Sequence, residues 1–146
     1  MVDDGVMDPL DPIVAEAEVP LPPRDAFVAF TAHMGEWWDP VLSPDPATFS
    51  GVDIDPRGEV ALRHGKQRFV FGEVTSWEPG TAYAQTFWLG HSADHPTTLT
   101  VGFVEAEVGT RVRLEHGGWS EATAAERARF DHWEDLMTRY AAHAAR

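Results

Sequence analysis

The chain contains no cysteine, and it also lacks long apolar runs. Without thiols it can form neither a disulfide nor a thiolate nucleophile, and cysteine-based metal sites are excluded. This composition fits a reducing compartment. No apolar run approaches the roughly 20 residues that a membrane-spanning helix needs, and the N-terminus shows no signal-peptide pattern. We therefore expect a soluble, cytoplasmic protein.

Positive charge is scarce as well. The 146 residues include 11 Lys and Arg against 24 Asp and Glu, Lys66 is the sole lysine, and the formal net charge is −13. Binding to nucleic acid needs clustered Lys and Arg that displace counterions from phosphates, and an anionic membrane surface would repel this chain. We expect neither a nucleic-acid partner nor a membrane contact, and we attribute the acidity to solubility.

Apolar and aromatic residues, by contrast, are plentiful. Hydrophobic residues make up 43% of the chain, with six Trp and eight Phe, which is enough for one core and for an aromatic-lined cavity. Residues 1–12 carry four aspartates and two prolines with little to bury, so we expect a flexible acidic tail there. Residues 13–146 are expected to form a single domain.

The strongest single signal is a long amphipathic helix at the end of the chain, over residues 121–142. Thr123 and Glu126 have the spacing of a capping box, and Ser120 is a second possible cap. Large apolar residues then recur at helical spacing and form one face: Phe130, Trp133, Leu136, Met137 and Tyr140. Burying each such side chain contributes roughly 1.5–3 kcal/mol, so the helix needs a broad apolar partner.

The segments before this helix predict that partner to be a β-sheet. Alternation and turn signals predict strands at 13–19, 47–52, 59–63, 67–77, 82–89, 97–107 and 110–116. In the last strand Val112, Leu114 and His116 share one face, which we expect to point inward. Residues 82–89 carry large aromatics on both faces, so their inward side stays undecided.

A short helix is expected between the first two strands. Prolines and Asp25 mark its start, Ala26, Phe27, Phe30 and Met34 give it an apolar face, and Gly35 is expected to end it. A turn or second short helix follows at 36–40. The predicted fold class is α+β: a curved antiparallel sheet of about six to seven strands wrapped around a long C-terminal helix, with two short helices after the first strand.

Several short motifs, spread over residues 13–140, together resemble the SRPBCC superfamily. They are the sequence VPLPPRDAFVAFT at 19–31, Trp37-Trp38, Gly72-Glu73-Val74 with Glu78-Pro79, Gly109-Thr110-Arg111-Val112 and Leu114-Glu115-His116-Gly117-Gly118-Trp119. Within the superfamily the chain is most similar to the activator of heat-shock-protein-90 ATPase family. The resemblance implies the helix-grip fold, also called START-like or birch-pollen-allergen-like, in which seven strands grip a C-terminal helix.

The resemblance also implies a cavity between sheet and helix that holds apolar small molecules. Some members are cyclases, dehydratases or hydrolases, many bind or carry ligands, and a few stimulate the chaperone, so one fold hosts several functions. No catalytic residue is common to the whole family. From the aromatic positions and this fold we predict the ligand-binding residues to be Trp37, Trp38, Phe71, Trp88, His116, Trp119, Phe130, Trp133 and Met137.

His116 is the polar residue of greatest interest. An imidazole inside an apolar cavity could orient a ligand or act as a general acid or base. The commoner case, which we place first, is a buried neutral histidine that is hydrogen-bonded to its neighbours, and His64 raises the same question more weakly. His91 and His95 flank Asp94 in a polar loop without further ligands, and His132 lies among acidic, solvent-facing residues. We predict no metal, and no phosphate-binding glycine loop or nucleophile elbow indicates a cofactor.

Three functional hypotheses follow. The first is binding of a small apolar or aromatic molecule, with Trp37, Trp38 and Trp88 near the mouth and His116 as the polar handle. The second is a cyclase-type or dehydratase-type enzyme in which His116 transfers a proton, although no second polar partner is evident. The third is a protein-interaction module similar to the chaperone activator, and a homodimer is also possible. Binding, rather than catalysis, is the leading hypothesis.

Overall fold

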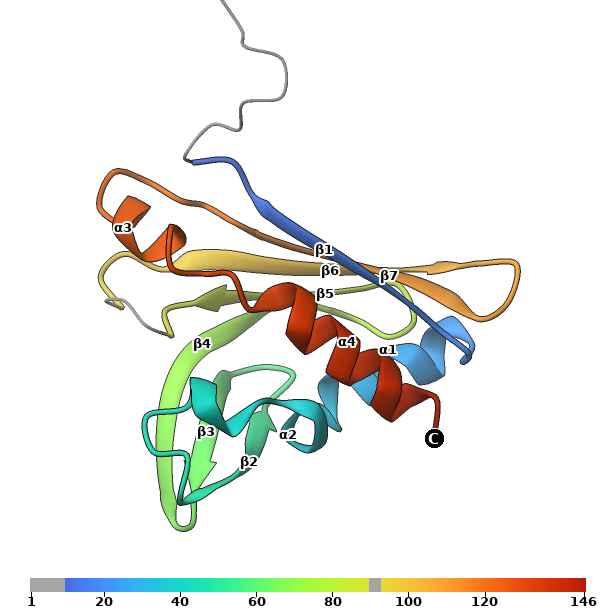
Figure 1. The fold of residues 1–146 in the computed structure, drawn as a ribbon, viewed down its shortest axis with the longest axis horizontal. Coiled ribbons are helices and arrows are strands. Elements are labelled where there is room, and N and C mark those ends of the chain that lie inside the picture. Colours follow the sequence, from blue (N-terminus) through green and yellow to red (C-terminus); the bar gives the residue numbers. More distant parts are fainter. Residues whose placement is uncertain (1–9, 90–92) are drawn as a thin grey trace, which may run out of the picture.

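The computed structural model describes residues 10–89 and 93–146, and this part of the chain forms seven strands with helices on one face (Figure 1). In chain order the elements are β1 Ile13–Val19, α1 Pro23–Thr31, α2 Met34–Trp37, the 3-10 helix η1 Pro40–Leu42, β2 Phe49–Ile54, β3 Glu59–His64, β4 Gln67–Glu78, β5 Ala82–Phe87, β6 Thr97–Glu105, β7 Thr110–Gly117, α3 Ala124–Arg127 and α4 Trp133–Ala144. The predicted α+β helix-grip fold is confirmed. Most of the expected tail, residues 1–9, lies outside the described residues.

The strands form one antiparallel sheet in the order β1-β7-β6-β5-β4-β3-β2. Register shifts interrupt the pairing of β4 with β3 and with β5, and such irregularities bend a strand. At Gly72 in β4 the neighbouring strand approaches so closely that an added Cβ would lie 2.1 Å from the carbonyl oxygen of Thr86. The long β4 therefore curves, and the sheet curls into a half-barrel (Figure 1).

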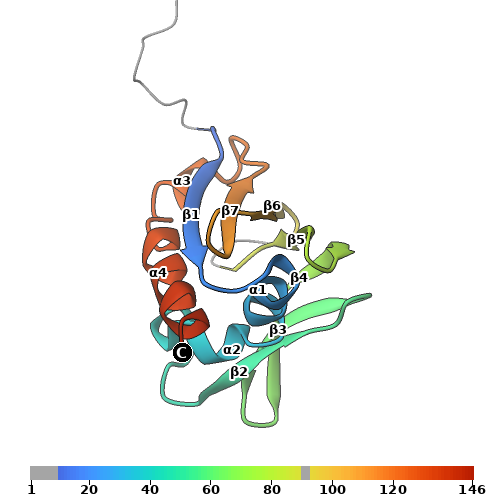
Figure 2. The ribbon, with the colours of Figure 1, turned by 90° about the vertical axis from the view of Figure 1, so that its right-hand side faces the viewer.

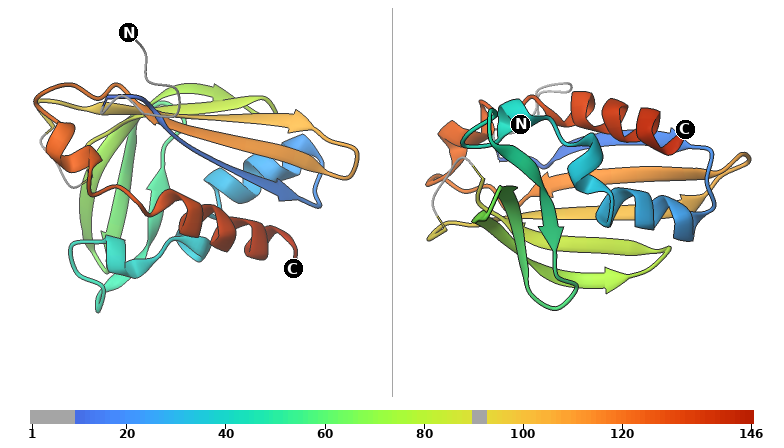
Figure 3. Two further views of the ribbon diagram at one scale, coloured as in Figure 1. Left: turned by 45° about the horizontal axis from the view of Figure 1, so that its top comes forward. Right: turned by 90° about the horizontal axis from the view of Figure 1, so that it is seen from below.

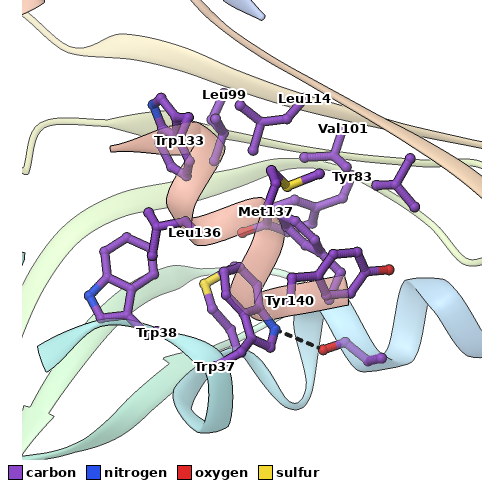
Figure 4. Close-up of a cluster of buried hydrophobic side chains, with 14 of the residues drawn as sticks. Trp37, Trp38, Tyr83, Leu99, Val101, Leu114, Trp133, Leu136, Met137 and Tyr140 are labelled. Carbon is purple, nitrogen blue, oxygen red and sulfur yellow. Dashed lines mark hydrogen bonds between the residues drawn. The ribbon is translucent and has the colours of Figure 1, made fainter. Parts of the chain in front are cut away.

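The concave face of the sheet is filled by α1, α2 and α4. All three helices lie on this face, and α4 closes the side opposite β4 and β5 (Figures 2 and 3). From α4, Met137 points toward Leu114 and Val101 of the sheet (Figure 4). Val112, Leu114 and His116 are completely buried, so the inward face predicted for β7 is confirmed. In β5 the inward residues are Tyr83, Gln85 and Phe87, which settles the side that the sequence left undecided.

The C-terminal helix is not continuous, contrary to the prediction for 121–142. It divides into α3 and α4, separated by residues 128–132, and the Thr123 side chain makes no capping bond to α3. Instead the Thr123 hydroxyl accepts a hydrogen bond from the Ser120 amide at 2.9 Å. The break lets α3 reach the start of β1, where Arg127 Nε donates to the Asp11 carbonyl at 2.8 Å, while α4 crosses the concave face. One straight helix could not do both.

The short helices after β1 also differ from the prediction in one respect. Gly35 lies within α2 rather than ending a helix, and the break between α1 and α2 falls at residues 32–33. The glycine is required by proximity, since an added Cβ would lie 2.7 Å from the amide nitrogen of Val52 in β2. Among the described residues, none of the helices is long and apolar enough to cross a membrane.

Candidate functional site

A pocket of about 320 Å³ opens between the end of β5, the segment from α2 to η1, and the break between α3 and α4. Its walls are mainly apolar, with charged and polar side chains at the rim; the lining residues are Trp38, Leu42, Phe87, Leu89, Glu126, Arg129, Phe130, His132, Trp133 and Leu136. Leu136 lies between Trp133 and Trp38 (Figure 4). The pocket is thus at one end of α4, where the helix enters the sheet's concave face.

Local structure explains why the aromatic side chains meet here. Trp133 and Leu136 are three residues apart in the first turn of α4, so they share one face of the helix. Trp38 follows α2 in an extended conformation, and its ring lies edge-on to Trp133 with centroids 6.3 Å apart. Phe87, the last inward residue of β5, contacts both Trp133 and Phe130, at centroid distances of 5.8 and 5.6 Å. Four aromatic rings from four segments therefore form the inner wall.

His116 lies directly behind this wall and is completely buried. The indole N–H of Trp133, which can only donate, bonds to His116 Nδ1 at 3.0 Å. The other ring nitrogen, Nε2, is 2.6 Å from the Thr97 hydroxyl, and that hydroxyl donates to the Phe87 carbonyl at 3.0 Å. The network therefore assigns His116 as the neutral tautomer with its proton on Nε2. It joins β5, β6, β7 and α4 at one point.

A sequence model of the family described as "Activator of Hsp90 ATPase homolog 1-like protein" matches residues 20–145. The chain belongs to this family. A comparison with curated protein sequences finds no match.

Solved structures share the fold of this chain. The chain is similar to the self-sacrificing resistance protein CalC from Micromonospora echinospora (18% identity, 94% of this chain and 96% of that one, TM-score 0.66) and to the Aha1 dimer from Colwellia psychrerythraea (19%, 89% and 92%, 0.63). It also resembles DynU16, a protein of the dynemicin biosynthetic locus, of which it covers 46% (15% identity, 91% of this chain, 0.64). At these identities the likeness concerns the fold alone.

The predicted ligand-binding residues of this family member fall into three groups. Trp38, Phe130 and Trp133 line the pocket. Trp37, Phe71 and Met137 lie in the packed core, each with 2% or less of its surface exposed. The ligand-binding role of all these residues stays a prediction.

The third group lies around the pocket rather than in its lining. His116 and Trp119 lie behind the inner wall, where the Trp119 indole donates to the His116 carbonyl at 2.8 Å. Trp88, just after β5, is half-buried, and its indole donates to the Val70 carbonyl at 3.0 Å. Sequence reasoning did not select several other lining residues: Leu42, Phe87, Leu89, Glu126, Arg129, His132 and Leu136. Of these, Leu136 could have been selected from the sequence, because it lies on the apolar face of the predicted helix.

The rim of the pocket carries charges of both signs. Arg129 is exposed and pairs with the half-buried Glu126 at 3.8 Å, and His132 Nδ1 lies 3.1 Å from a carboxylate oxygen of Asp131. Exposed ion pairs of this length contribute little to stability, so these side chains can rearrange around a ligand at small cost. The arrangement therefore combines an apolar interior with an adaptable polar mouth.

Neither of the two buried phenols of the core, Tyr83 and Tyr140, lines the pocket. Burial raises the pKa of both Tyr83 and Tyr140 above the ordinary value of 10.0. The Tyr83 hydroxyl donates to Gln85 Oε1 at 2.7 Å, and that of Tyr140 donates to the Ala26 carbonyl at 2.8 Å. Both phenols therefore serve as fixed structural donors. Of the loop histidines His91 and His95, His91 lies outside the described residues.

Proposed function

We propose that this protein binds a small, mainly apolar or aromatic molecule in the pocket at the N-terminal end of α4. The observation that carries the proposal is a space of about 320 Å³ whose inner wall is built from Trp38, Phe87, Phe130 and Trp133. Small-molecule sites are typically concave, largely apolar and about 300–1,000 Å³ in volume, with few polar groups. This pocket is at the lower end of that range, so it suits a compact ligand.

The polar rim suggests how the ligand is oriented. An apolar body would be buried against the aromatic wall, and a polar substituent would point outward to Arg129, Glu126 or His132. His116 supports this arrangement indirectly, since it fixes the Trp133 ring through the bond to its indole N–H. If His116 were to bond the ligand directly, it would have to break its hydrogen bond with Trp133 or Thr97.

The same geometry argues against proton transfer by His116. Its Nδ1 lone pair is engaged by Trp133, and its Nε2 proton is engaged by Thr97, so neither nitrogen is directed to the pocket. A general acid or base must reach the group with which it exchanges a proton. Binding without turnover is therefore the function that these contacts favour.

The hypothesis of a protein-interaction module rests on family membership and on the likeness to the Aha1 dimer. It predicts that a surface, and not the pocket, is the working site. Light scattering of the purified protein tests self-association, and a pull-down with the heat-shock-protein-90 chaperone tests the second partner. Recovery of no chaperone and a monomeric mass would remove this alternative without affecting the ligand-binding proposal.

Filling the pocket tests the ligand-binding proposal. Leu42 lines the pocket from η1, whereas its neighbour Val41 is 72% exposed, so Leu42→Trp and Val41→Trp introduce the same side chain inside and outside the site. The probe is the uncharged fluorophore N-phenyl-1-naphthylamine, and native mass spectrometry of the purified protein looks for a retained ligand. We expect Leu42→Trp to weaken probe binding at least about tenfold, which is about 1.4 kcal/mol, while Val41→Trp binds like the parent.

Equal binding by both variants would place the probe elsewhere and overturn the proposal. Absence of binding by the parent, both to this probe and to a panel of apolar and aromatic compounds, would overturn it as well. Thermal unfolding of the two variants controls for loss of fold. A retained small molecule in the native mass spectrum, lost in Leu42→Trp, would support the proposal most directly.

A further inference from the structure

Two histidines and a glutamate come together at the C-terminal end of α4. This end lies about 15 Å along the helix from Trp133, at a rise of 1.5 Å per residue. His33 lies in the link between α1 and α2, Glu36 lies in α2, and His143 lies in the last turn of α4. The imidazole nitrogens and the carboxylate oxygen that these residues offer all lie within 4.8 Å of one another. His33 Nδ1 contacts Glu36 Oε2, and the two imidazole rings are 5.6 Å apart between centroids.

Two hydrogen bonds from other side chains of α4 to backbone carbonyls hold α4 against α1 and α2, independently of His33, Glu36 and His143. Arg139 Nε donates to the Trp37 carbonyl at 2.9 Å, and the Tyr140 hydroxyl donates to the Ala26 carbonyl at 2.8 Å. His143 is four residues after Arg139 and three after Tyr140, so all three share the face of α4 that contacts α1 and α2. The convergence of His143 with His33 therefore follows from how the helix is docked.

A second, independent observation at this place concerns His143. His143 Nδ1 is buried, and no hydrogen-bond partner for it occurs among the described residues. A buried polar atom without a partner is costly, and coordination of a cation by this nitrogen would explain its position. His33 and His143 both line a depression of the surface, which Asp25 and Arg146 also line, so the two histidines can be reached from solvent.

From these observations we propose that His33, Glu36 and His143 form a binding site for a divalent transition-metal ion, with Zn²⁺ as the best fit. Two imidazoles and one carboxylate are a known donor set for zinc, with a fourth position open to water. Bonds of about 2.0–2.1 Å in a tetrahedral site put neighbouring ligand atoms about 3.3 Å apart. Side-chain rotations at the surface can close the 4.8 Å spread to that distance. A bound ion would tie the end of α4 to the α1–α2 corner.

The test uses protein without a polyhistidine tag, stripped of metal by a chelator, and titrated with ZnCl₂ in a calorimeter. We expect saturable binding of one Zn²⁺ per chain and a higher Tm in its presence, because an ion that binds the folded state stabilises it. His33→Ala, Glu36→Gln and His143→Ala should each weaken binding at least about tenfold, since even changes outside the ligand shell cost 10- to 100-fold. Co²⁺ should give the visible absorption of a low-coordinate site in the parent and lose it in His143→Ala.

The matched control is His95→Ala, which removes an exposed histidine from the loop before β6. It should bind Zn²⁺ like the parent, and the metal-free Tm of all variants checks that they fold. The proposal is overturned if the parent shows no saturable binding, if His143→Ala binds as tightly as the parent, or if His95→Ala alone loses the ion. Because these readouts involve no apolar ligand, they stand or fall independently of the proposed function.

Discussion

The aromatic core has two ends that are built from similar residues and behave differently. The closed end is defined here by Phe30, Trp37, Tyr83, Phe103 and Tyr140, and the open end by Trp38, Phe87, Phe130, Trp133 and Leu136. At the closed end Trp37, Tyr83 and Tyr140 each donate to a protein acceptor, and the rings fill the space between α1, α4 and the sheet. At the open end a pocket remains, and the buried indole N–H of Trp38 has no partner among the described residues.

This difference shows how one fold combines a filled aromatic cluster with an open pocket. Interior packing at native density leaves few voids, so a pocket beside a filled aromatic cluster marks a place where packing has been left incomplete. The break between α3 and α4 provides this opening, because it places Phe130 in the inner wall and Arg129 at the rim instead of continuing the helix across the sheet. The closed end is thus filled by its own side chains, whereas the open end keeps a pocket.

The largest expected effect comes from breaking the closed end. Trp37→Ala should lower the free energy of unfolding by about 3–5 kcal/mol, the usual cost of removing a buried aromatic side chain. Trp37 is 2% exposed, and the substitution also removes the hydrogen bond from its indole to the Ala29 carbonyl. Urea unfolding measures the change. Val41→Ala, at a 72% exposed position, is the control and should stay within about 0.5 kcal/mol.

Alkaline pH should weaken the closed end through its two phenols. The pKa values of Tyr83 and Tyr140 are raised in the folded state, so the unfolded chain loses these protons first as pH rises through 10.0. Stability should then fall above that pH by about 1.4 kcal/mol per pH unit for each tyrosine. Urea unfolding at several pH values between about 9 and 11, which bracket the ordinary pKa of a phenol, measures how steeply stability falls with pH.

Tyr140→Phe tests the origin of this alkaline loss. It removes one titrating group and should roughly halve the slope above the ordinary phenol pKa, although it also loses the bond to the Ala26 carbonyl and starts from lower stability. An unchanged slope in this variant would assign the alkaline loss to other groups.

At the open end, a smaller effect distinguishes two tryptophans. Trp133→Phe keeps an aromatic ring but removes the donor to His116 Nδ1, and we expect a cost of about 1–3 kcal/mol. Trp38→Phe makes the same change at an indole whose N–H has no partner among the described residues, so it should cost less. Thermal unfolding of the two variants gives the comparison. Equal costs would mean that the bond to His116 adds nothing beyond ring volume.

The strands and their inward faces could be predicted from sequence with small errors at their ends. Alternation in β1 and β7 is regular, so the inward side of Val112 and Leu114 followed from period two alone. In β5 this signal failed, because Tyr83 and Phe87 face inward while Trp88 just after the strand is also large and half-buried. The prediction of one continuous helix was wrong, because the helical spacing of apolar residues continues through Phe130 and Trp133 and does not mark the break. The contact of Arg127 with the Asp11 carbonyl, which accompanies the break, joins residues that are far apart in the sequence.

The candidate sites could be predicted only in part. The sequence identified Trp38, Phe130 and Trp133 as aromatic residues for a cavity, but it could not place Leu42, which comes from a Pro- and Ser-rich segment without periodicity. His33 and His143 are far apart in the sequence, and they come together in space only because α4 docks against α1 and α2. Contacts between distant segments carry no local signal, and both sites are made of such contacts.

The smallest expected change in stability is at the rim, where binding and folding should separate most clearly. Arg129 is 72% exposed in its side chain and its ion pair with Glu126 is long, so Arg129→Ala should change the free energy of unfolding by less than about 0.5 kcal/mol. Its effect on ligands should depend on their charge: affinity for an aromatic carboxylate should fall, while affinity for the neutral analogue should hold. Arg111→Ala, on the opposite face of the sheet and also in an exposed ion pair, is the control. If both ligands lost affinity equally, Arg129 would contribute to the shape of the pocket and would not distinguish ligands by their charge. That result would contradict the distinction between an apolar interior and a polar mouth.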